Sequence, residues 1–107
     1  MVDEQTRMTV QNYMRVARDA GIQVQRAILF GSHARGEAGE WSDIDLVIIA
    51  PELDHPPVRP IIRKLWELRV KTDSRIEPIA CGVKEWETND SRPILEIARL
   101  EGIVIEA

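Results

Sequence analysis

Cysteine is almost absent from this sequence. Cys81 is the single cysteine in 107 residues, so no disulfide can form within the chain. Free cysteines usually behave as small apolar residues. We therefore expect Cys81 to be buried in the core.

Positive charge is scarce as well. There are 14 Lys and Arg residues against 18 Asp and Glu residues, which gives a net charge of −4. Binding of long nucleic acids relies on an excess of basic residues that neutralise phosphates. The composition therefore disfavours a polymerase or a genomic DNA-binding protein and predicts no long nucleic acid partner. A small nucleotide is still compatible, because metal ions can neutralise its charge.

Long apolar runs are missing too. No segment approaches the roughly 18 apolar residues of a membrane-spanning helix, and the first residues lack the apolar core of a signal peptide. These absences predict a cytoplasmic protein with no membrane partner. The composition, 44% hydrophobic and 30% charged, is typical of a folded globular protein, and 107 residues suffice for one domain.

The first half of the chain alternates helical and strand patterns. Apolar residues at helical spacing predict a helix over residues 4–20, and Gly21 suits its end. The short apolar run 27–30 predicts a buried strand. The β-branched run 44–50, which stops at Pro51, predicts a central strand.

The second half continues this alternation. We expect a helix from residue 58 to 71, a third strand over 75–81, a helix over 93–100 with Ser91 as N-cap, and a short last strand over 103–105. Pro78 cannot donate a ladder hydrogen bond, so it should lie at a sheet edge or a bulge. The pattern predicts an α/β (α+β) fold with a small mixed sheet flanked by helices.

A glycine–serine turn follows the first predicted strand. Gly31 and Ser32 would start a helix, whose free backbone N–H groups favour a phosphate. Gly31 also allows close approach of a ligand to the backbone, and the Ser32 hydroxyl can donate to a phosphate oxygen. The alternative for this pair alone is an ordinary turn and N-cap.

Two aspartates lie at the start of the second predicted strand. Asp43 and Asp45 are two residues apart, so they share a face while Ile44 points into the core. Neighbouring carboxylates repel, and a divalent cation such as magnesium removes that conflict. The alternative is a pair of solvated turn residues.

A two-metal phosphoryl-transfer site generally uses a further acid. Glu77 on the third strand is our candidate, because it alternates with Ile76 and neighbouring strands are only about 4.8 Å apart. Asp73 is the second choice, since it lies among polar turn residues. A solvated position is the alternative for Glu77.

Other polar and aromatic residues are less informative. Arg35 can contact phosphate or brace the turn, and we weigh the two equally. We expect His33 and His55 to have no catalytic role. Trp41 is expected to cover the core rather than stack on a base, and Trp66 to be a core residue; Trp86 has no predicted place.

These residues resemble a known family. Gly31-Ser32-x-Ala34-Arg35-Gly36 followed by Ser42-Asp43-x-Asp45-Leu46 is similar to the signature of polymerase-β-like nucleotidyltransferases, in particular their minimal single-domain prokaryotic branch. The resemblance implies one nucleotidyltransferase domain over residues 1–107. One departure is that the third acid is most often aspartate in the family, whereas here Glu77 is followed by Pro78.

The resemblance also implies roles for the motif residues. Gly31 and Ser32 would hold the nucleoside triphosphate, with Arg35 as a further nucleotide-binding residue. The catalytic and metal-binding residues would be Asp43, Asp45 and Glu77, with two Mg²⁺ ions as cofactors.

The reaction implied is transfer of AMP from ATP to a hydroxyl acceptor. Minimal members commonly occur beside an all-helical HEPN-type protein, in pairs similar to toxin–antitoxin systems in which the transferase modifies a toxin tyrosine. We therefore expect an antitoxin with a HEPN-type partner, in a homo- or hetero-oligomer. The alternatives are an antitoxin that acts by binding alone, and one subunit of a small-molecule (antibiotic) adenylyltransferase.

Overall fold

A four-stranded mixed sheet forms the centre of the computed structural model, which describes residues 2–88 and 91–106. The strand order is β3-β2-β1-β4. Strand β1 (Arg26–Phe30) runs antiparallel to both β2 (Ile44–Ile49) and β4 (Ile103–Ile105), whereas β2 runs parallel to β3 (Ile76–Cys81). The predicted fold class, a small mixed sheet flanked by helices, is confirmed.

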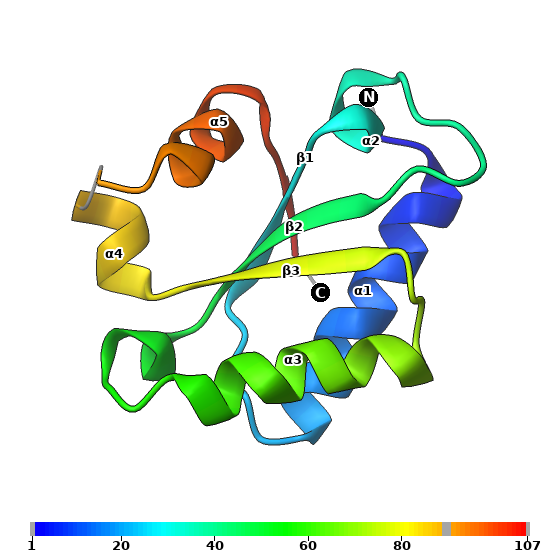
Figure 1. Ribbon diagram of the computed structural model, residues 1–107. Helices are drawn as coiled ribbons and strands as arrows, with labels where there is room; N and C mark the ends of the chain where they lie inside the picture. The colour runs from blue at the N-terminus through cyan, green and yellow to red at the C-terminus, as the bar shows by residue number, and fades with distance from the viewer. Residues whose placement is uncertain (1, 89–90, 107) are drawn as a thin grey trace.

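Two helices cover one face of the sheet. They are α1 (Glu4–Asp19) and α3 (Arg59–Lys71), which lie together on one side in Figure 1. The Tyr13 hydroxyl donates a 2.6 Å hydrogen bond to the Leu65 carbonyl and so ties α1 to α3. Fully buried side chains from both helices and from alternate strand positions form this larger core: Val10, Met14, Leu29, Ile44, Leu46, Ile48, Leu65 and Ile76.

The opposite face carries a smaller core. It is covered by α4 (Val83–Thr88) and α5 (Pro93–Glu101), on the other side of the sheet in Figure 1. Strand residues that alternate with those of the larger core form this cluster with two buried residues of α5, Leu95 and Ala98; the strand residues are Ile28, Phe30, Val47, Ile49 and Cys81. Because Asp43 and Asp45 lie two residues apart and precede Val47, their side chains are on this α5 face.

Two expectations about single residues are confirmed. Cys81 is fully buried. Pro78 lies in β3, at one end of the strand order, where only β2 pairs with it among the described strands. The short helix α2 (Ser32–Arg35) and the 3-10 turn η1 (Pro51–Asp54) complete the order of elements.

The structure corrects the expectations for two tryptophans. Trp41 is 84% exposed, because it lies in the loop between α2 and β2 rather than over the core. Trp66 is 38% exposed, and its ring lies 4.6 Å from the guanidinium carbon of Arg69, which lies on the same helix. Placing both in the core was wrong; a cation–π contact shields the Trp66 ring.

Helix α4 was not predicted, since its 6 residues are too few to show helical periodicity. It contains Trp86, whose ring lies 4.7 Å from the guanidinium carbon of Arg99. The expected N-cap of α5 was also wrong: the cap position is Arg92, with Pro93 in the first turn. None of the described helices combines the length and the apolar character needed to cross a membrane.

Candidate functional site

The two halves of the motif meet where β1 ends and β2 begins. Because these strands are antiparallel, Phe30 at the end of β1 is paired with Asp45 in β2. Gly31 and Ser32 therefore lie beside the two aspartates, although more than ten residues separate them along the chain. A cavity of about 380 Å³ opens at this point, and its walls come from both halves and from α5: Phe30, Gly31, Ser32, Arg35, Ser42, Asp43, Asp45, Ile94, Ile97 and Glu101.

Position 31 needs glycine for two reasons, its backbone conformation and the closeness of the Asp45 side chain. Its φ of 79° and ψ of −155° fall in a region that is essentially limited to glycine. A Cβ at this position would lie 2.3 Å from Oδ2 of Asp45 and 3.3 Å from its Cγ. The absent side chain thus lets the Asp45 carboxylate lie directly against the turn that starts α2.

Asp45 also faces a second acid across the sheet. Asp45 and Glu77 are paired residues of the parallel strands β2 and β3, so their side chains lie on the same face. Burial raises the pKa of Asp45, and the nearby charges of Glu77 and Asp43 raise it further, whereas His33 and Arg35 act in the opposite direction. The three acids therefore form one negative region, although Glu77 lies outside the set of residues that line the cavity.

The fit of this region to a divalent cation rests on the aspartate pair. Within residues 2–88 and 91–106, no group of three His, Cys, Asp or Glu side chains is arranged to hold a metal ion. Magnesium, however, keeps several waters and commonly takes only one or two carboxylates together with substrate phosphates. Asp43 and Asp45 line one cavity and carry the charge conflict that a cation would relieve, so the pair fits such an ion.

Glu101 is a residue of the site that sequence reasoning missed. Its Oε2 accepts a 2.6 Å hydrogen bond from the Gly31 N–H and a 2.9 Å hydrogen bond from Nη1 of Arg35. Arg35 also donates from Nε to Oε1 of Glu37, at 2.7 Å. Glu101 lies at the end of a different helix, 70 residues from Gly31, and no local pattern points to it.

His33 lies beneath the site rather than in it. The side chain is only 8% exposed, with Nδ1 3.5 Å from Oγ1 of Thr6 and Nε2 3.5 Å from the Ser42 carbonyl oxygen. It bridges α1 and the residues just before β2. The absence of a catalytic role for His33 stays a prediction.

Asp73, the second choice for the third acid, is engaged elsewhere. Its Oδ2 accepts from Nη2 of Arg75 at 2.8 Å, and its Oδ1 accepts from Nε of Arg75 at 3.0 Å. These hydrogen bonds with Arg75 hold the pKa of Asp73 below its usual value. The carboxylate stabilises the turn before β3. Glu77, in contrast, is paired with Asp45 across the sheet, and its role as the third acid stays a prediction.

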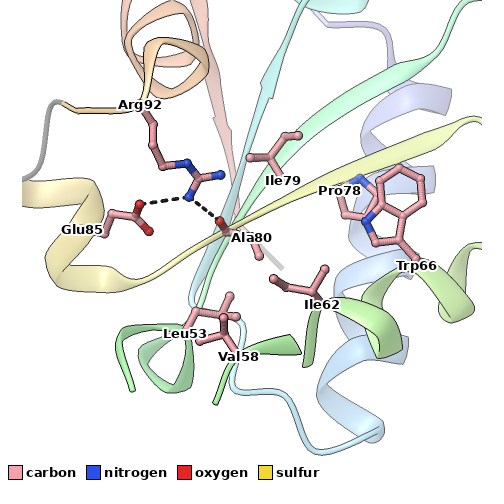
Figure 2. Close-up of a pocket in the computed structure, with 9 residues that line it drawn as sticks. All are labelled: Leu53, Val58, Ile62, Trp66, Pro78, Ile79, Ala80, Glu85 and Arg92. Atoms are coloured by element: carbon pink, nitrogen blue, oxygen red, sulfur yellow. Dashed lines mark hydrogen bonds and ion pairs between the residues drawn. The ribbon is translucent and has the colours of Figure 1, made fainter. Parts of the chain in front are cut away.

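A larger apolar hollow of about 550 Å³ lies elsewhere, at the β3 edge of the sheet (Figure 2). Leu53, Ile62 and Trp66 line it from one side. Arg92 closes part of it, since its Nη1 donates to the Ala80 carbonyl at 3.0 Å and to Oε2 of Glu85 at 2.9 Å. None of the motif residues lines this hollow, so the chemistry of the motif belongs to the smaller cavity.

A glycine turn beside paired carboxylates, set on a small mixed sheet, can bind phosphates and divalent cations. The profile of the nucleotidyltransferase domain family matches residues 14–98, and the chain belongs to that family. No curated protein sequence matches it.

Two solved structures share the fold. A candidate nucleotidyltransferase from Sulfolobus solfataricus has a TM-score of 0.67 and 13% identity, with 94% of this chain and 78% of that chain covered. A chain from a toxin–antitoxin structure with AMP-PNP has a TM-score of 0.61 and 21% identity, with 89% of this chain and 71% of that chain covered. At these identities the likeness is one of fold.

Proposed function

We propose that this member of the nucleotidyltransferase family transfers AMP from ATP to a hydroxyl acceptor with the help of Mg²⁺. The observation that carries the proposal is the contact between the two motif halves. The Asp45 carboxylate lies against Gly31 in a cavity that also contains Ser32 and Asp43. This arrangement supports the proposal, because a turn with N–H donors and a pair of acids that line one cavity could contact the same triphosphate.

The roles of the side chains follow from this placement. The Gly31 N–H, the Ser32 hydroxyl and the Arg35 guanidinium would bind phosphate oxygens. Asp43 and Asp45 would hold the metal ions, with Glu77 supporting them from the neighbouring strand. Bound magnesium supplies charge neutralisation and lowers the pKa of the acceptor hydroxyl.

Transfer itself exchanges one phosphorus–oxygen bond for another. The acceptor hydroxyl loses its proton to solvent, and its oxygen bonds to the α-phosphorus of ATP as the bond from that phosphorus to the oxygen bridging the β-phosphate breaks, so that pyrophosphate leaves. The protein contributes positioning and charge, because the reaction needs no covalent intermediate on a side chain.

For the acceptor, we propose a tyrosine hydroxyl on a HEPN-type toxin, so that this chain acts as the antitoxin. Two observations support a protein partner. The toxin–antitoxin structure with AMP-PNP contains a chain of this fold. Trp41, in the loop that leads to Asp43, is exposed and so available to a partner surface.

The test is intact-mass spectrometry of the HEPN-type protein after incubation with this chain, ATP and Mg²⁺. We expect a mass increase of one or more AMP units, which is lost with Asp43→Asn. Asp73→Asn is the matched control, because that carboxylate is bound to Arg75 outside the cavity. A stable complex without a mass shift would instead identify an antitoxin that acts by binding alone. If there is neither a mass shift nor a stable complex, the acceptor should be sought among small hydroxyl compounds, including antibiotics.

A further inference from the structure

A carboxylate of the protein itself holds two of the donors assigned to the triphosphate. Oε2 of Glu101 accepts from the Gly31 N–H at 2.6 Å and from Nη1 of Arg35 at 2.9 Å. Both donors line the cavity beside Asp43 and Asp45, and Glu101 lines it too. A carboxylate oxygen and a phosphate oxygen accept hydrogen bonds from the same kinds of donor.

We infer that Glu101 is an internal competitor of the triphosphate: it occupies the Gly31 and Arg35 donors in the nucleotide-free protein and must leave them when a nucleotide binds. The inference rests on the proposed function and adds regulation to the same site. The Glu101 carboxylate and a triphosphate are both anionic, so they would repel each other if both stayed within reach of these donors.

The surrounding structure indicates that the side chain moves and the helix does not. Leu95 and Ala98 anchor α5 in the smaller core, at 0% and 1% exposure. The backbone after Glu101 is held closely, because the Gly102 N–H donates to the Ala98 carbonyl at 2.8 Å and a Cβ at Gly102 would meet Ile28 at 2.3 Å. The Glu101 side chain is 26% exposed, so rotation about its own bonds can carry the carboxylate into solvent.

Arg35 would stay at the cavity after this rotation. Its Nε remains bonded to Oε1 of Glu37, which lies on the loop that follows α2. Release of Glu101 therefore frees Nη1 of Arg35 and the Gly31 N–H together, while the guanidinium keeps its place. The result is a site whose affinity for a triphosphate is lowered by one built-in anion.

The test compares Mg²⁺–ATP binding to the wild type and to Glu101→Gln by isothermal titration calorimetry. Glutamine keeps the size of the side chain and removes its charge. We expect the dissociation constant to fall at least about tenfold, the effect of losing one charged competitor from a hydrogen-bonded site. Glu96→Gln on the same helix is the matched control, since Glu96 pairs with Arg99 and does not line the cavity.

The outcomes separate this inference from the proposed function. If the wild type binds ATP and Glu101→Gln binds it equally or more weakly, Glu101 is a brace and the inference is wrong. An equal gain in Glu96→Gln would assign the effect to overall charge and would also overturn it. If neither protein binds ATP with Mg²⁺, the proposed function itself is wrong.

A second measurement needs no substitution and so cannot fail through misfolding. In the wild type, the NMR signals of the Gly31 amide and the Glu101 carboxyl carbon should both move when Mg²⁺–ATP is added. A Glu101 carboxyl signal that stays unchanged at saturating ATP would show that the contact persists, and would overturn the inference.

Discussion

The carboxylate of Asp45 lies so close to the Cα of Gly31 that a methyl group at position 31 would come within 2.3 Å of Oδ2. This contact joins the glycine turn to the strand of the acids. It also makes position 31 sensitive to substitution, because an added side chain would clash with Asp45 in addition to straining the turn.

Gly31→Ala should therefore cost more stability than a glycine substitution without such a neighbour. Gly36→Ala is the comparison, because Gly36 has a φ of 73° but no atom within 4 Å of an added Cβ. We expect Gly31→Ala to lower the free energy of unfolding by at least about 1 kcal/mol more than Gly36→Ala does, measured by urea denaturation. Part of the loss should return in Gly31→Ala/Asp45→Ala. Equal costs at the two glycines would contradict the contact.

Removing the charge of Asp45 should stabilise the metal-free protein at neutral pH. The raised pKa means that the folded protein binds more protons than the unfolded chain between the two pKa values, so the free energy of unfolding falls as pH rises through that interval and stays lower above it. With a chelator present, Asp45→Asn should melt at a higher temperature than the wild type near pH 7. The difference should shrink towards zero at about pH 3, where the unfolded aspartate is also largely protonated.

The same substitution should abolish transfer. We expect Asp45→Asn to lose at least about a hundredfold in kcat with Mg²⁺ and ATP, comparable to removing one strong electrostatic group from a transition state. Circular dichroism checks that the variant is folded. Substantial turnover in a folded Asp45→Asn protein would refute the role of this carboxylate.

Glu77 should matter for activity more than Asp73 does. Glu77→Gln is expected to lower kcat about 10- to 100-fold, the range found for residues that support metal ligands, and to raise the Mg²⁺ concentration needed for half-maximal rate. Glu77→Asp should keep much of the activity, because it preserves the charge. Asp73→Asn should weaken the turn before β3 through its lost Arg75 hydrogen bonds and leave kcat unchanged. A reversed order would make Asp73 the better candidate.

Trp41→Ala tests whether Trp41 takes part in substrate recognition without contributing to the stability of the fold. The side chain is 84% exposed, so its removal should change the free energy of unfolding by less than about 0.5 kcal/mol. If the ring contacts the base or the acceptor, KM for one of them should rise, and steady-state kinetics with each substrate varied in turn will show which. Trp66→Ala is the control, since Trp66 lines the distant apolar hollow. Unchanged KM values for both substrates would exclude Trp41 from recognition.

The strands and most of the helices could be predicted because their apolar residues follow a period. The run 44–50 and the helical spacing in α1 and α3 are long enough to show it. Helix α4 was missed because it is short and its N-terminus is satisfied from elsewhere: the Lys84 and Glu85 N–H groups donate to Asp54. Such a cap, 30 residues away, leaves no local signal.

The aromatic residues and Glu101 show a second limit of prediction from the sequence. Helical spacing predicted that Trp66 lies on the apolar side of α3. Periodicity cannot show that the ring lies at the edge of that apolar side, partly exposed and covered by the Arg69 guanidinium. Glu101 reaches the site because Gly102 and β4 bring the end of α5 back beside Gly31. That contact depends on tertiary structure. The sequence motif could therefore point to Asp43 and Asp45, but not to the Glu101 carboxylate that accepts hydrogen bonds from Gly31 and Arg35.

The β3 edge has one more consequence, for how a partner can attach. Pro78 has no N–H to offer an incoming strand, and Arg92 already occupies the Ala80 carbonyl (Figure 2). The opposite edge strand, β4, is only 3 residues long. Both margins of the sheet are therefore poor templates for strand addition. A protein that binds this chain should dock through side chains and helices, and the chain itself should resist edge-to-edge polymerisation at high concentration.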